Sequence, residues 1–401
     1  MTFHPFDDAS SSNAYVAVGA SGRCLRLSSS AFALIRARQA GLDYEEISRA
    51  MSPATRVPAE ELARVGEHLL KTLDRIESEP SPKPWGFVLA ATVIPARVVN
   101  LTSRRLAWLF GTRAAAVAAT LLVVALATRP TLAGGFSTSD AVSAYFIFLL
   151  SIVFHEFGHS TACVHAGADP GDIGAAIYIV YPAMYSDVSC AWRLPRYQRL
   201  LVDLGGNYFQ AIFGLACFWL FLVTDWPPLR GAVLLIMSAI TVSLNPLFRF
   251  DGYWVLSDLL GVPNLFKESR RAVAQHTNQL YRRSPVSLRW PAGTTVLIVI
   301  YGIVSLVLWT WFILAIWPTM LWGRILHYPL ALVRVLEPIR HGVLPQGVDL
   351  VHLGWATLLL IAAVVIVWRG GVSLCEMVAP WLRRVRRWIV SAAAPSKITQ
   401  P

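Results

Sequence analysis

The hydrophobic pattern separates a polar segment, residues 1–79, from a long apolar remainder. Within that segment, short alternating runs predict two strands, at 15–18 and 24–27. Amphipathic stretches predict three helices, at 31–40, from 43 onward and at 59–77. Asp43 and Glu46 have the spacing of a capping box at the start of the second helix. We expect a small N-terminal α+β domain, followed by a stiff proline-rich linker at 79–84.

The rest of the chain contains hydrophobic stretches that approach the length of a bilayer span, for which about 20 apolar residues are needed. There are six of them, at 108–128, 140–165, 200–224, 229–250, 293–317 and 353–368. The apolar stretch 85–100 is broken by Pro95, and we expect it to lie on the membrane surface. The predicted fold is mainly α: a polytopic membrane protein with about six transmembrane helices and the N-terminal domain.

Composition supports this prediction. Hydrophobic residues make up 55% of the chain and charged residues 15%, against about 25% charged residues in typical globular domains. The net charge of +11 arises in the apolar part, which suits contact with anionic lipid headgroups. No nucleic-acid-binding motif is present, so we expect no nucleic-acid partner. The five cysteines are scattered and do not form the pattern of a disulfide framework.

Arginine and lysine are unevenly distributed between the predicted loops. Most lie in the loops on the N-terminal side, and by the positive-inside rule this side is cytoplasmic. An even number of spans then places both termini in the cytoplasm. The polar start of the chain does not have the pattern of a secretory signal peptide. The stretch 380–390, which alternates apolar residues with arginines, is expected to lie on the inner leaflet.

The sharpest chemical motif lies inside the second predicted span. His155 and His159 are four residues apart, share one helical face and can bind one Zn²⁺, while Glu156 between them can activate water. The preceding residues 144–154 are almost wholly apolar, and ionisable residues within a span are costly and usually functional. The alternative is a polar patch buried between helices.

A zinc hydrolase needs a third protein ligand, and four residues are candidates: Cys163, Asp187, Asp203 and Asp251. Cys163 shares the helical face of the histidines. However, three ligands in a row along one helix spread over about 12 Å at 1.5 Å per residue, too far for one ion. We therefore expect Cys163 to be a packing residue. Asp187 is either a turn residue or a residue that supports the metal ligands or gates the substrate.

Asp251 is the best-placed candidate. It follows the fourth predicted span, at a depth in the cytoplasmic half similar to that of His155. Pro246 and Gly252 interrupt the helix around it. Interrupted backbone at membrane depth is tolerated where it lines a protein cavity.

These two motifs resemble those of a known family. HEFGH, followed about 90 residues later by NPLFRFDGYW, is similar to the paired HExxH and N-P-x-x-x-x-D-G motifs of the site-2 proteases, the intramembrane zinc metalloproteases of peptidase family M50. The resemblance covers roughly residues 105–265. It implies zinc as cofactor and a place in the bacterial inner membrane.

The resemblance also implies roles for individual residues. His155, His159 and Asp251 would bind the zinc ion, and Glu156 would be the catalytic base. Asn245 would orient the substrate or stabilise the oxyanion.

A closer subgroup also fits. The stretches 181–189, 192–194, 252–254 and 262–265 resemble bacterial M50 proteins described as peptide zinc metalloproteases. The glycine motif of the third core helix, commonly G-P-x-x-N, departs from the pattern and reads Gly-Gly-Asn-Tyr-Phe at 205–209. We assign it no ligand role. The short connection between 166 and 195 has no room for the PDZ insert of some relatives.

The N-terminal segment resembles the PqqD-like fold, a winged-helix-like module that binds precursor peptides of ribosomally made natural products. Residues 26–28, after the second predicted strand, carry this likeness. The alternative is a generic winged-helix domain. The predicted organisation therefore has four parts. A PqqD-like domain (1–79) is followed by a linker with an interfacial segment (80–105). The metalloprotease core (106–265) comes next, and a C-terminal transmembrane region with a basic tail (266–401) ends the chain.

The leading functional hypothesis is an intramembrane zinc endopeptidase that removes a leader from, or matures, a ribosomally made peptide recruited by residues 1–79. The expected partners are membrane lipids and this peptide. Two alternatives remain: intramembrane proteolysis of a signalling or anti-sigma factor, and a non-proteolytic export or immunity protein with a structural metal site. The intact Glu156 argues against a structural site, which has no need of a base.

Overall fold

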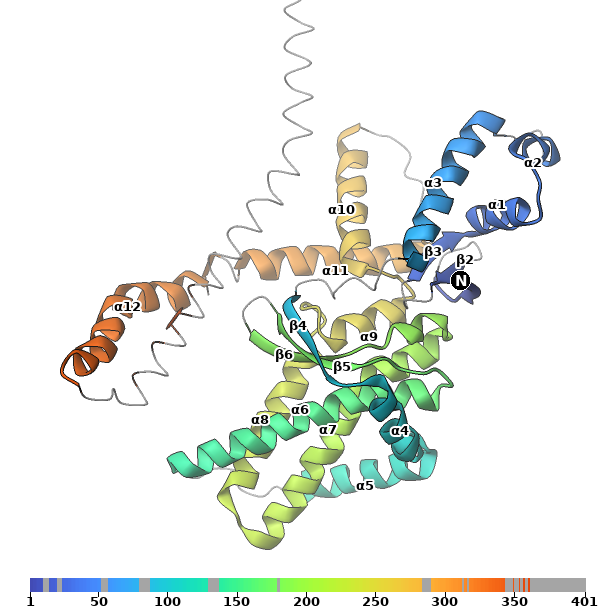
Figure 1. The fold of residues 1–401 in the computed structure, drawn as a ribbon. Coiled ribbons are helices and arrows are strands. Elements are labelled where there is room, and N and C mark those ends of the chain that lie inside the picture. Colours follow the sequence, from blue (N-terminus) through green and yellow to red (C-terminus); the bar gives the residue numbers. More distant parts are fainter. Residues whose placement is uncertain are drawn as a thin grey trace, which may run out of the picture. The chain divides into compact units, whose positions relative to one another are not determined.

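The fold is mostly helical, with two small sheets (Figure 1). The computed structural model describes residues 1–9, 14–19, 24–51, 57–78, 87–128, 137–178, 181–282, 290–311, 314–315, 317–342, 349, 353, 356–357 and 360. The chain divides into two compact units, Met1–Ala176 with Pro182–Leu306, and Ile177–Tyr181 with Val307–Pro401. All the predicted site residues belong to the first unit.

The N-terminal segment forms the first sheet and three helices. Strands β1 (Thr2–Phe6), β2 (Ala14–Val18) and β3 (Cys24–Ser28) are antiparallel in the order β1-β2-β3, and helices α1 (Ser29–Gln39), α2 (Tyr44–Ala50) and α3 (Ala59–Ser78) follow. The two predicted strands and three helices are confirmed, as is the capping box of Asp43 and Glu46. Strand β1 was not predicted; it lies at the sheet edge, where its Pro5 is tolerated.

Residues 87–106 include most of the stretch that is expected to lie on the membrane surface. They form strand β4 (Phe87–Ile94) and helix α4 (Ala96–Leu106), and β4 joins β5 (Ile173–Tyr178) and β6 (Tyr181–Ser186) in a second sheet of order β4-β5-β6. Pro95 ends the strand. The N-terminus of α4 is capped from a distance, because the Asp172 carboxylate accepts a hydrogen bond from the Ala96 N–H at 2.6 Å.

Three helices are long and apolar enough to cross a membrane: α6 (Thr138–His165), α7 (Arg196–Thr224) and α11 (Ala292–Trp311). Helix α4 continues into the short helix η1 (Ala107–Phe110), and α5 (Thr112–Thr128) follows at an angle of 69°. If Ala96–Phe110 and α5 together form one bent span, it is the fourth. Among the described residues this gives three or four spans, fewer than the six expected. The predicted span 353–368 and the tail 380–390 lie outside the described residues, apart from single positions.

The predicted fourth span is shorter than expected. Helix α8 (Pro227–Ser243) has 17 residues and ends well before residue 250. A turn containing Pro246 interrupts the chain, and helix α9 (Asp251–Leu260) starts at the third candidate ligand. Asn245 lies in this turn, where its side-chain oxygen accepts a hydrogen bond from the Leu247 N–H at 2.9 Å.

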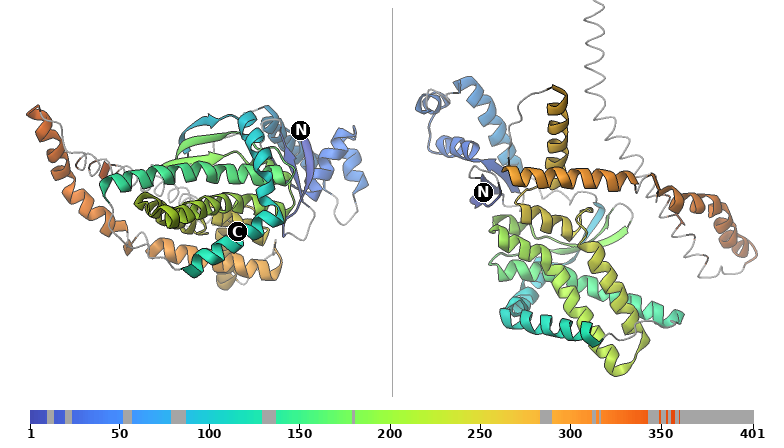
Figure 2. Two further views of the ribbon diagram at one scale, coloured as in Figure 1. Left: turned by 90° about the horizontal axis from the view of Figure 1, so that it is seen from below. Right: turned by 180° about the vertical axis from the view of Figure 1, so that it is seen from behind.

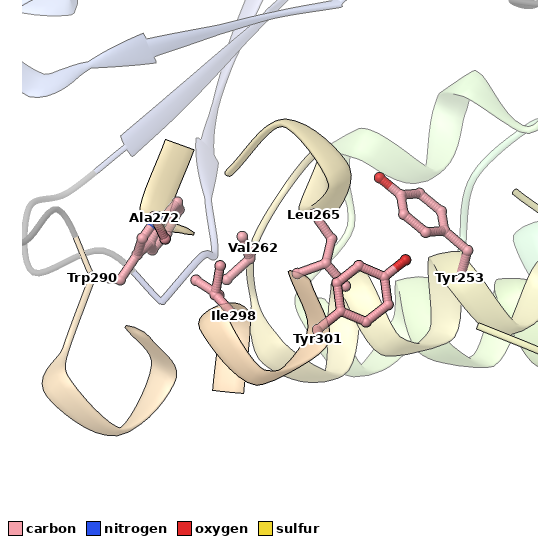
Figure 3. Close-up of a cluster of buried hydrophobic side chains, with 7 residues drawn as sticks. All are labelled: Tyr253, Val262, Leu265, Ala272, Trp290, Ile298 and Tyr301. Carbon is pink, nitrogen blue, oxygen red and sulfur yellow. The ribbon is translucent and has the colours of Figure 1, made fainter. Parts of the chain in front are cut away.

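Helices α6, α7 and α8 pack together, with α4 and α9 against them (Figure 2). A second cluster joins α9, helix α10 (Leu265–Arg282) and the start of α11; its buried side chains are Tyr253, Val262, Leu265, Ala272, Trp290, Ile298 and Tyr301 (Figure 3). The Tyr301 hydroxyl donates to the Pro246 carbonyl at 3.0 Å, so α11 also fixes the turn before α9. The second unit contains helix α12 (Trp317–Arg340).

Polar contacts tie Asp7 to the start of α7. The Asp7 carboxylate accepts a hydrogen bond from the Arg196 N–H at 3.1 Å, so it caps a helix that has no local side-chain cap. The buried Arg199 guanidinium donates to the Asp7 carbonyl at 3.0 Å and pairs with Asp258 of α9 at 2.9 Å. These contacts attach the N-terminal segment to α7, one of the helices that build the site.

Candidate metal centre

Two histidines of α6 and one aspartate of α9 bring their ligand atoms together. The Nε2 atoms of His155 and His159 are 3.1 Å apart, and each faces the Asp251 carboxylate, at 3.1 Å from His155 and 3.5 Å from His159. One ligand atom from each residue lies within 4.8 Å of the other two, so this group can bind a metal ion. The three side chains are mostly buried, with exposed fractions between 10% and 19%.

The orientation of the His159 ring is fixed by the backbone of α7. Its Nδ1 lies 2.7 Å from the carbonyl oxygen of Val202. A carbonyl can only accept a hydrogen bond, so Nδ1 carries the proton and Nε2, which faces Asp251 and His155, is the nitrogen that can bind a metal ion. This is the arrangement in which histidine ligates a metal, with the second ring nitrogen held by a protein acceptor.

Asp251 is held by two side chains as well as by its place at the start of α9. The Asn207 Nδ2 and the Ser243 Oγ each donate a hydrogen bond to Asp251 Oδ2, both at 2.8 Å. These donors come from α7 and from the last residue of α8. They occupy one carboxylate oxygen and leave Oδ1 turned toward His159. The carboxylate is therefore oriented before any ion binds.

Two glycine contacts create the space at the centre. A Cβ built on Gly206 would lie 2.4 Å from His159 Nε2 and 2.6 Å from His155 Nε2, so any side chain at 206 would fill the place between the ligand nitrogens. One turn away, a Cβ on Gly158 would lie 2.2 Å from the Gly205 carbonyl oxygen. Helices α6 and α7 thus cross backbone to backbone, which brings the Val202 carbonyl within reach of His159.

The residues of this site fit a metal ion. Two imidazole lone pairs and a carboxylate converge on a space that only a residue without a Cβ leaves open. A donor set of two nitrogens and one oxygen matches the three protein ligands of catalytic zinc sites. Glu156, next in sequence to His155, is buried with 7% exposure. The donor atoms and the space between them therefore both suit a metal ion.

The other candidate ligands do not belong to this group. The Cys163 sulfur contacts the Cys190 sulfur at 3.3 Å, in agreement with a packing residue. Asp187 accepts a hydrogen bond from the Ser189 N–H at 3.1 Å, which is typical of a turn residue. Asp203 lies on α7 and outside the converging set.

Sequence reasoning missed Gly206, Asn207 and Ser243. The Gly-Gly-Asn run at 205–207 was visible as a departure from a known motif, and its adjacent glycines were the available indication of close backbone packing. Ser243 has no comparable pattern, since a single serine near a helix end is common. It could not have been selected from the sequence.

Comparison with known proteins gives no relative. No family model, no curated protein and no solved structure matches this chain. The argument for function therefore rests on the site itself.

Proposed function

We propose that this protein is a zinc-dependent endopeptidase of the site-2 protease type, which cleaves a membrane-associated peptide. The observation that carries the proposal is the convergence of His155, His159 and Asp251 beside the buried Glu156. Two of these ligands lie on a helix apolar enough to cross a membrane. A hydrolytic centre at membrane depth suits a peptide bond that is itself held in or against the bilayer.

The residues of the chain divide the chemistry among them. His155, His159 and Asp251 would hold the zinc ion, which supplies Lewis acidity to the carbonyl and acidifies water when bound. Glu156 takes the proton of the attacking water and returns it to the leaving amine. Asn207 and Ser243 keep the Asp251 carboxylate in place, and Asn245 orients the peptide.

Substrate delivery is assigned to residues 1–79. These residues resemble a PqqD-like peptide-binding module at 26–28, and on this resemblance we propose leader removal or maturation of a ribosomally made peptide. Asp7 contacts the start of α7, so a peptide held by the N-terminal segment would have a high effective concentration near the site. We place the protein in the bacterial inner membrane, with about six spans and both termini cytoplasmic.

The decisive experiment compares two variants of the purified full-length protein. Glu156→Gln should abolish cleavage of a candidate peptide and retain zinc, because Glu156 supplies a proton acceptor and no ligand. Asp251→Ala should lose both zinc and activity, because two ligands remain of the three expected. Glu61→Gln, which changes an exposed carboxylate of α3, is the matched control and should behave like wild type.

Other outcomes would point elsewhere. Full activity in Glu156→Gln would exclude the mechanism. Zinc bound at one equivalent with no cleavage of any membrane-associated peptide by the wild type would favour a structural metal site in an export or immunity protein. Cleavage of a membrane-anchored signalling factor in preference to precursor peptides would favour regulated intramembrane proteolysis.

A further inference from the structure

Two cysteines outside the metal centre lie in direct contact. Cys163 is in the last turn of α6, one turn beyond His159, and Cys190 is in the short helix η2 (Ser189–Arg193). Their sulfur atoms are 3.3 Å apart, although the residues are 27 positions apart in the chain. A disulfide requires about 2.05 Å between the sulfurs. A shift of little more than 1 Å at η2 is therefore enough to join them.

Cys163 lies in an apolar cluster. Cys163 is fully buried with Ala162, Ala191 and Val202, and Cys190 packs on the edge of the same cluster. The thiols belong to no metal-binding group in the part of the chain that the structure describes. Packing holds the two sulfurs together without a ligand between them.

The two thiols differ in accessibility and in acidity. Cys190 is half-buried, whereas Cys163 is fully buried. The contact with Cys163 lowers the pKa of the Cys190 thiol, the nearby Arg193 guanidinium acts in the same direction, and burial opposes both. A third thiol, Cys24 on β3, donates to the Ser189 carbonyl at 3.9 Å, and burial raises its pKa to about 11. Cys190 is thus the nucleophile of the three.

We propose that Cys163 and Cys190 form a reversible disulfide, with a small-molecule disulfide such as oxidised glutathione as the oxidant. The Cys190 thiolate attacks one sulfur of the oxidant, whose S–S bond breaks and releases one thiolate. The Cys163 sulfur then attacks Cys190, displaces the second thiolate and closes the protein disulfide. The two protein thiols lose two electrons and two protons, and the oxidant becomes two thiols.

The bond would connect the metal-binding helix to the element that contacts the N-terminal segment. Helix η2 carries Trp192, whose ring packs on Phe6 at 5.8 Å between centroids, and Ser189, the acceptor for Cys24. Oxidation would therefore fasten η2 to α6. Disulfides that form in reducing compartments are usually transient and redox-sensing, which fits a reversible pair of this kind.

The test uses full-length protein in detergent, equilibrated with mixtures of reduced and oxidised glutathione, then alkylated, digested and analysed by mass spectrometry. We expect a peptide linking Cys163 to Cys190 that rises in one two-electron transition, while Cys24 and Cys217 remain alkylated. Hydrogen exchange of the 188–194 amides should slow at least tenfold in the oxidised protein. Cys163→Ala should instead leave a stable glutathione adduct on Cys190.

Three results would overturn the proposal. The first is a Cys24–Cys190 linkage in place of the expected one. The second is a glutathione adduct on Cys190 that persists in wild-type protein. The third is no disulfide at the most oxidising ratio, measured on wild-type protein so that misfolding of a variant has no influence. Zinc content and peptide cleavage do not enter this test, so its failure is distinguishable from failure of the proposed function.

Discussion

The crossing of α6 and α7 and the attachment of residues 7–9 are built on different interactions. At the crossing, Gly158 meets Gly205 backbone to backbone, and the precision of the metal centre comes from missing side chains. At the attachment, Asp7 and the buried Arg199 hold the N-terminal segment by hydrogen bonds and charge. The helix crossing therefore tolerates no added side-chain atom, whereas the attachment of the N-terminal segment can lose one hydrogen bond and keep the others.

The largest effect is expected from Gly206→Ala. The new Cβ would stand within 2.6 Å of both ligand nitrogens, so we expect metal binding to fall by more than about 100-fold and activity to disappear. Zinc affinity by chelator competition measures this, with circular dichroism to confirm folding. Gly293→Ala is the control, because a Cβ there meets nothing within 4 Å. If Gly206→Ala bound zinc with unchanged affinity, the two histidines would not be the metal ligands.

Arg199→Met should give the next largest effect, on stability. The substitution keeps much of the side-chain volume but leaves Asp258 without its partner at 2.9 Å. Breaking a buried ion pair on one side costs about 3–5 kcal/mol. Denaturant unfolding in detergent tests this, with the exposed Arg105→Met as the matched control. A loss below about 1 kcal/mol would mean that the attachment does not support α7 and α9.

Asn207→Ala should weaken zinc binding more than Ser243→Ala. Loss of a residue that orients a metal ligand typically costs 10–100-fold in affinity. Asn207 is the more buried of the two donors, at 5% exposure, so solvent has less access to the place of its amide. The variants are compared by chelator competition at constant pH. Equal affinities in both variants and wild type would show that α9 alone positions Asp251.

The smallest effect is expected from Asp7→Ala. Removing a helix N-cap costs about 1 kcal/mol, and the Asp7 carbonyl still accepts from Arg199. Asp7→Asn retains a capping oxygen and should stay within a few tenths of a kcal/mol of wild type. Unfolding midpoints of the three proteins make the comparison. An equal loss in both variants would indicate that the charge of Asp7 matters rather than its cap.

Periodic and short-range patterns predicted the elements well. The strands at 14–18 and 24–28, the capping box at Asp43 and the long helices α6 and α7 follow from local sequence. The fourth predicted span is shorter than expected, because a count of apolar residues does not register the turn around Pro246 that follows α8. Strand β4 was missed because its partner, β5, lies some 80 residues further along the chain.

The candidate site was predicted where residue types carry chemistry at recognisable spacing. His155, His159 and Asp251 converge as the two motifs implied. Gly206, Asn207 and Ser243 were not selected, because their roles depend on how closely α6, α7 and α8 approach. That approach is a property of the packed helices, and no periodicity in one segment encodes it.

The cap that Asp7 provides for α7 has a consequence for biosynthesis. Asp7 and Arg196 are 189 residues apart. At translation rates of about 5–20 residues per second, on the order of 10–40 s pass before the partner leaves the ribosome. Until Trp192 has been made, the Phe6 ring of the first strand lacks this packing partner. Closing this long loop is a late step, so the metal centre acquires its complete support only after most of the chain has been made.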